Sequence, residues 1–157
     1  MSETPAPQAK TVLDGVDAVR AAVGTHLGYS DWLEIDQDRV NTFADATGDH
    51  QWIHVDVERA KAGPFGAPIA HGFLTLSMLP MFFASAMEIL ETGMGVNYGL
   101  NKVRFTSPVP VGSRLRGRMK LLSCDPVDNG GMQLAWLVTV EREGSDKPAC
   151  VAESIAR

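Results

Sequence analysis

The sequence lacks several features that would place it directly in one of the large classes of proteins. It has two cysteines, Cys124 and Cys150, in 157 residues, which excludes a disulfide-rich secreted scaffold. Its net charge is −5, which argues against a nucleic-acid partner because such partners favour a basic face. Its first ten residues, MSETPAPQAK, hold no apolar stretch of the kind that an export signal needs. Two cysteines can form a disulfide, but these features favour reduced thiols and a cytoplasmic protein.

Long hydrophobic runs are also scarce, with one exception. The segment FLTLSMLPMFFASAMEIL, residues 73–90, is nearly long enough to cross a bilayer. It contains three hydroxyl side chains, Pro80 and Glu88, and no basic residue flanks it. These interruptions favour a helix buried at the centre of a domain over a membrane span.

Composition and patterning predict one globular domain, residues 11–157, after a flexible tail, residues 1–10. The first half reads as helical: helices are expected over 12–23, over 37–47 after a cap at Asp36, and over 57–63 after a cap at Asp56. A strand is expected over 27–36. The long apolar helix follows from His71-Gly72.

The second half reads as four strands, within residues 95–112, 113–124, 132–144 and 148–157. The sequence DNGG, residues 128–131, is typical of a hairpin turn. As a four-strand antiparallel meander joined by the earlier strand, these segments predict an α+β fold in which an antiparallel five-stranded sheet wraps around one long central helix. The free edges of such a sheet predict a homodimer formed by edge pairing.

Ionisable residues gather in FADATGDHQWIHVD, residues 43–56. Asp49 and His54 lie five positions apart in a loop after Gly48, and a carboxylate and an imidazole that converge on one water can activate it. The alternative is a capping aspartate and a satisfied, partly buried histidine. A metal site with His50 is a further alternative, but Gly48 and Asp49 interrupt the helical spacing that would align His50 with His54.

The start of the long helix is a second candidate for chemistry. If the helix begins at His71-Gly72, its free N–H groups form a position for an oxyanion or a carbonyl, although an ordinary helix start explains the same residues. Ser77 can point toward this region, or it can bond back to a carbonyl of its own helix. Alternating basic residues on a later strand read as a solvated face, with phosphate binding as the alternative: Arg114, Arg116, Arg118 and Lys120.

In combination these motifs resemble the MaoC-like, (R)-specific enoyl-CoA hydratase family. FADATGDHQWIHVD is followed by AHGFLTLSML and then by NYGLNKVRFTSPVPVG. The sequence looks closest to the single-domain, NodN-like mycobacterial and actinobacterial members. The resemblance runs from about Leu27 to the C-terminus.

The resemblance implies a hot dog fold, a homodimer, and reversible hydration of a trans-2-enoyl-CoA to a (3R)-3-hydroxyacyl-CoA. Carried over by position, Asp49 and His54 match the catalytic pair and Gly72 the N–H that binds the thioester carbonyl. Ser77 matches a supporting serine, and we assign a supporting role to His71 as well. Neither a metal nor a redox cofactor is expected, because coenzyme A arrives as part of the substrate.

One departure from the family pattern concerns the loop between the catalytic pair. Many members carry Asn-Pro where this sequence has Gln51-Trp52. Two other functions stay open: a hot dog acyl-CoA thioesterase, which would attack the thioester carbonyl, and a non-catalytic acyl-CoA-binding module, which would bind without turnover.

Overall fold

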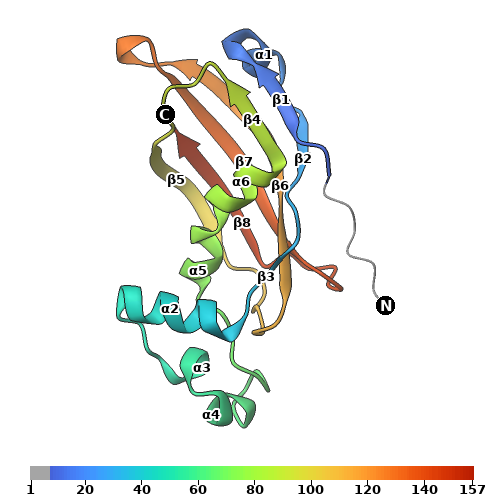
Figure 1. Cartoon of the computed structure of the whole chain (residues 1–157), viewed down its shortest axis with the longest axis vertical. Helices are drawn as coiled ribbons and strands as arrows, with labels where there is room; N and C mark the ends of the chain where they lie inside the picture. Colours follow the sequence, from blue (N-terminus) through green and yellow to red (C-terminus); the bar gives the residue numbers. More distant parts are fainter. Residues whose placement is uncertain (1–7) are drawn as a thin grey trace.

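The computed structural model describes residues 8–157, and in it one antiparallel sheet wraps around a central helical segment (Figure 1). Of the tail expected over residues 1–10, residues 1–7 lie outside the described part of the chain. Residues 8–10 are exposed and belong to no helix or strand.

The N-terminal segment differs from the expected single helix over 12–23. Residues Thr11–Asp14 form strand β1, and helix α1 covers only Gly15–Ala21. Strand β1 pairs in parallel with β4, Met87–Leu90. The apolar spacing is compatible with either structure locally, and the distant partner decides in favour of a strand. The strand expected over 27–36 is likewise two short strands, β2 (His26–Tyr29) and β3 (Leu33–Glu34).

The capped helices are confirmed. Helix α2 spans Gln37–Thr47, and the Asp36 carboxylate accepts a hydrogen bond of 2.8 Å from the Arg39 N–H at its start. After α3 (Trp52–Val55), helix α4 spans Val57–Lys61, two residues shorter than expected, and Asp56 caps the Arg59 N–H in the same way. These ends are decided by hydrogen bonds over three residues, which a sequence pattern can predict.

The long apolar helix is shorter than expected. It consists of α5 (Gly72–Ser77) and α6 (Leu79–Ala86), which meet at Met78. The expected continuation to Leu90 is wrong because residues 87–90 form β4 against β1. Within residues 8–157, no helix has both the length and the apolar character needed to cross a membrane.

The main sheet is five strands wide and antiparallel, with the order β2-β6-β7-β8-β5; β3 pairs with β6 beside β2. The later strands are β5 (Asn97–Arg104), β6 (Arg114–Pro126), β7 (Met132–Arg142) and β8 (Cys150–Ala156). The expected DNGG turn joins β6 to β7. Strand β5, however, pairs with β8 and not with β6 as in a meander. No tight turn links β5 to β6, because residues 105–113 carry two prolines.

The core lies between α6 and the inner face of β6, β7 and β8. Along β6 the buried positions alternate with half-buried ones. Gly117 allows close packing here, because a Cβ atom at this residue would lie 3.0 Å from the Cβ of Phe82 on α6. The basic row of β6 lies on the opposite face, where Arg114 pairs with Glu143 and Arg116 with Glu141.

Candidate active site

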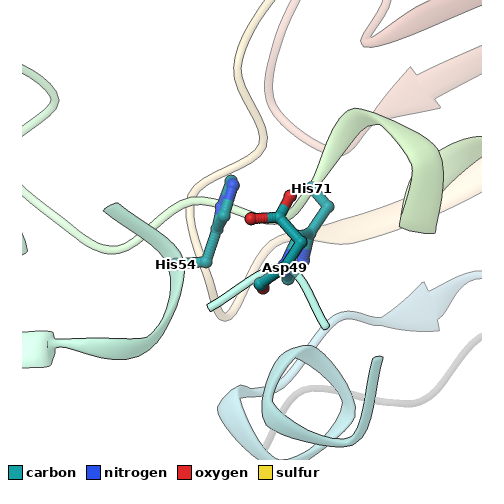
Figure 2. Close-up of side chains that lie close together, drawn as sticks. All are labelled: Asp49, His54 and His71. Atoms are coloured by element: carbon teal, nitrogen blue, oxygen red, sulfur yellow. The ribbon is translucent and has the colours of Figure 1, made fainter. Parts of the chain in front are cut away.

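Three side chains from separate segments converge below the start of α5 (Figure 2). Asp49 follows α2, His54 lies in α3 and His71 directly precedes α5. Their polar atoms, one from each residue, all lie within 4.8 Å of one another. Both histidines are buried and Asp49 is exposed. The structure therefore brings the predicted pair together with one of the two supporting residues.

Gly48 determines the direction of the loop that carries Asp49. Gly48 ends α2 with φ 81°, a left-handed conformation that favours glycine. The chain turns sharply here, and the Asp49 carboxylate accepts a hydrogen bond of 3.3 Å from the Gln51 N–H. Asp49 thus has the local turn-forming role that the alternative interpretation assigned to it. The same turn leaves the carboxylate beside the two imidazoles.

A backbone hydrogen bond determines the tautomer of the neutral His54 imidazole. Its Nδ1 lies 2.6 Å from the Ile69 carbonyl oxygen. A carbonyl only accepts, so Nδ1 carries the proton and Nε2 keeps its lone pair. Burial lowers the pKa of His54 below its usual 6.5; the Ile69 hydrogen bond opposes this, His71 adds to it and Asp49 opposes it. A base with a free lone pair near neutral pH results.

A residue that the sequence did not indicate holds the backbone of His54. The Gln37 side-chain amide donates a hydrogen bond of 2.9 Å to the His54 carbonyl and another, of 3.0 Å, to Asn41. These bonds tie α3 to α2. A glutamine at the first position of a helix has no pattern that predicts such a distant contact.

Gly72 is the first residue of α5 and lies directly against the ring of Phe105. Within residues 8–157, no hydrogen bond uses its N–H. A Cβ atom here would lie 2.9–3.0 Å from three ring carbons of Phe105. Only glycine fits without displacing that ring, and the free N–H is the feature that a carbonyl-binding position requires.

Two candidate residues are engaged elsewhere. Ser77 is exposed, and its hydroxyl donates a hydrogen bond of 2.6 Å to the Phe73 carbonyl, as in the alternative interpretation of this residue. His50 is exposed and pairs with Asp45 at 2.8 Å, and the hydrogen bond to Asp45 raises the pKa of His50. His50 therefore contributes nothing to the cluster.

The cluster has the residue types of a metal site, but its geometry fits one poorly. The His54 and His71 rings are stacked, with centroids 3.8 Å apart and planes 25° apart. Imidazole binds a metal in its ring plane at about 2.0–2.1 Å from nitrogen. Two nearly parallel planes do not meet that close to both rings. An acid–base site suits this geometry better.

An apolar cavity of about 770 Å³ lies further along the central helices. Its walls come from α1, α6, the segment 87–97 and the ends of the sheet strands, and include Val19, Leu79, Phe83, Ala84 and Leu134. None of the three clustered residues lines this cavity. The side-chain cluster and the apolar cavity therefore lie at different parts of one helical segment.

A sheet wrapped around a helix defines a hot dog domain, and in this chain an aspartate and two histidines lie together at the start of that helix. The chain belongs to the MaoC-like domain family, whose family model matches residues 18–141.

Individual relatives agree. The chain is 56% identical over 144 residues to 3-hydroxyacyl-thioester dehydratase Z of Mycobacterium tuberculosis, covering 92% of this chain and 95% of that one. It is 51% identical over 140 residues to nodulation protein N of Rhizobium meliloti, covering 88% and 87%. Its fold is similar to that of an R-hydratase from Pseudomonas aeruginosa, with TM-score 0.69, 21% identity, and coverage of 85% and 79%.

Proposed function

We propose that this protein is an (R)-specific enoyl-CoA hydratase, which reversibly adds water to a trans-2-enoyl-CoA to give a (3R)-3-hydroxyacyl-CoA. The observation that carries the proposal is the unprotonated Nε2 of His54 beside the Asp49 carboxylate, at the start of a helix with a free N–H. The 56% identical relative is a 3-hydroxyacyl-thioester dehydratase by name, which supports the same reaction in reverse.

The groups suit both directions of this reaction. In hydration, Asp49 accepts one hydrogen bond from the water and His54 Nε2 takes its other proton while oxygen attacks C3. Negative charge moves to the thioester oxygen, where the Gly72 N–H donates a hydrogen bond. The His54 imidazolium then returns the proton to C2, so one water is added and no proton is gained or lost. Dehydration reverses these steps.

The apolar cavity supports an acyl substrate longer than the four carbons of crotonyl-CoA. It is lined by residues of α6, which continues from the helix that begins at Gly72. We propose that the distal part of the acyl chain enters this space, where apolar walls favour its transfer from water.

A second copy of the chain is the partner that we propose for the edge strand β5. Seven of its eight residues are exposed, and large apolar side chains lie exposed along and near it, among them Tyr98, Leu100 and Phe105. An edge strand presents unpaired N–H and C=O groups, and pairing with a symmetric copy satisfies them. The homodimer would continue the sheet across two subunits.

The test is hydration of crotonyl-CoA, followed by loss of the ultraviolet absorbance of the conjugated thioester. Asp49→Asn and His54→Ala are expected to lose most of the activity, by about 10²–10⁴-fold for acid–base groups, with circular dichroism unchanged. Asp45→Asn is the matched control, because Asp45 is an exposed aspartate of the same segment outside the cluster.

Other outcomes separate the alternatives. Release of free thiol along with the absorbance loss would identify a thioesterase, because hydration leaves the thioester intact. Binding of acyl-CoA without turnover, unaltered in Asp49→Asn, would identify a binding module. If hydration is seen, an (R)-specific 3-hydroxyacyl-CoA dehydrogenase then reads the configuration of the product.

A further inference from the structure

His71 contacts both members of the catalytic pair. Its Nε2–H donates a hydrogen bond of 2.9 Å to the backbone carbonyl of Asp49. Its ring stacks on that of His54, with centroids 3.8 Å apart. The side chain is 2% exposed, and Phe43 packs against it with a centroid distance of 4.9 Å. His71 therefore has a fixed position against Asp49 and His54, which lie 22 and 17 residues before it in the sequence.

We propose that His71 is a positioning residue, which sets the Asp49 loop through its Nε2–H and the plane of the His54 ring through stacking. This inference rests on the proposed function, because it assigns a role within the same acid–base site.

The Asp49 loop has few other restraints. Asp49 is exposed, and the next residue, His50, pairs with the exposed Asp45 of α2. Within residues 8–157, the one hydrogen bond to the Asp49 side chain is the 3.3 Å bond from the Gln51 N–H. That bond joins two neighbouring residues of one loop, so it shapes the turn without fixing its place in the molecule. The His71 hydrogen bond ties the Asp49 backbone to the buried segment before α5. Loss of this bond would let the carboxylate move away from His54.

The His54 ring needs a second restraint for a related reason. Its hydrogen bond to the Ile69 carbonyl fixes one ring nitrogen but allows the ring to tilt about that contact. A stacked neighbour fixes the plane, and with it the direction of the Nε2 lone pair. A misplacement of about 1 Å at a catalytic group can cost about 10²-fold in rate.

The two contacts use different parts of His71, so they can be removed one at a time. His71→Gln retains an N–H donor near the position of Nε2 and loses the ring. His71→Phe retains a ring against His54 and loses the donor. We expect each variant to lower kcat by about 10-fold to 100-fold with KM within about twofold of wild type. His71→Ala should lose more than either. His50→Gln is the matched control, because His50 is exposed and outside the cluster.

The pH profile is a second readout. The titratable groups that face His54 are Asp49, from the loop after α2, and His71, from the segment before α5; Gln37 of α2 is neutral. Burial and the His71 imidazole both lower the pKa of His54. In His71→Gln, which removes the ring and admits water, the acid limb of kcat should move to higher pH. In His71→Phe, which preserves burial, the displacement should be smaller.

Several results would overturn the inference. Folded His71→Gln and His71→Phe with wild-type kcat and a wild-type acid limb would show that His71 positions neither group. A raised KM with unchanged kcat would make it a substrate-binding residue instead. If His71→Phe does not fold, His71→Gln and an NMR titration of His54 decide alone, and an unmoved His54 titration would refute the stacking role.

Failure of the proposed function is distinguishable from failure of this inference. Wild-type protein that does not hydrate crotonyl-CoA counts against the function, whatever the variants do. Wild-type hydration with unaffected His71 variants counts against the positioning role alone.

Discussion

The free N–H of Gly72 leads to a sharp prediction for Gly72→Ala. The added methyl would lie 2.9–3.0 Å from three ring carbons of Phe105, whereas carbon atoms in contact prefer about 3.5–4.0 Å. The ring must therefore move by roughly 0.5–1 Å. Phe105 is 46% exposed, so it has space to move, and the cost in stability should be near the lower end of the 1–3 kcal/mol typical of overpacking.

This cost should appear as a fall of about 2–4 °C in Tm, the shift expected for about 1 kcal/mol in a chain of this size. The effect on activity should be larger. A methyl group beside the N–H obstructs the approach of the thioester oxygen, and removal of one oxyanion donor costs about 10²–10³-fold in kcat. Calorimetry and crotonyl-CoA hydration, measured on the same preparation, separate the two effects.

Two further variants control for packing. Gly72→Ala combined with Phe105→Leu should recover Tm without recovering kcat, because it relieves the ring contact and leaves the methyl in place. Gly93→Ala lies in the cavity wall, where a Cβ would have no atom within 4 Å, and should change neither Tm nor kcat for crotonyl-CoA, whose four carbons are too short to enter the cavity. Wild-type kcat in a folded Gly72→Ala protein would refute the assignment of this N–H to the thioester oxygen.

Three other predictions address the base, the cavity and the edge strand. The pKa of His54 is lower in the folded chain than its usual 6.5, so the unfolded chain binds the extra proton first as pH falls. The free energy of unfolding should therefore decline as pH falls through about 6.5 and level off below the pKa of His54 in the folded chain. Thermal melts of wild type and His54→Ala should differ in this pH range, and identical pH slopes for the two proteins would contradict the prediction. Ala84→Leu adds bulk at a cavity wall and should reduce kcat/KM several-fold for trans-2-octenoyl-CoA but not for crotonyl-CoA. Equal effects on the two substrates would count against an acyl chain in the cavity. Leu100→Lys places a charge on the exposed edge strand β5 and should shift the mass measured by light scattering from dimer to monomer, whereas a wild-type mass of one chain would exclude the dimer outright.

Local features of the fold were predictable from the sequence because local interactions decide them. The caps at Asp36 and Asp56 depend on hydrogen bonds across three residues. The alternation along β6 depends on one strand facing the core. In contrast, the strand at 11–14 and the place of β5 depend on partners that are 47 or more residues away in sequence. Their own residues fit more than one arrangement. The helix expected over 12–23 is therefore found only over 15–21, and the expected four-strand meander only in β6, β7 and β8.

The candidate site divides in the same way. Asp49, His54 and His71 carry side chains whose chemistry marks them in the sequence, and the structure brings them together. The contacts that orient them involve backbone carbonyls of Ile69 and Asp49. Every residue has such a carbonyl, so no residue type indicates which one will accept a hydrogen bond. Tautomer, ring stacking and the role of Gln37 therefore emerge only from the three-dimensional arrangement.

In the loop after Asp49, Trp52 stands at the position where the family resemblance leads us to expect a proline. A proline at the start of α3 would fix φ through its ring. Here Trp52 starts the helix, and its indole packs on two parts of the α4 region. The Arg59 guanidinium lies 4.3 Å from the ring centroid, and a Cβ at Gly63 would lie 2.9 Å from the ring. Tertiary packing thus fixes the Trp52 ring against the α4 region, and His54 lies two residues later in the same short helix.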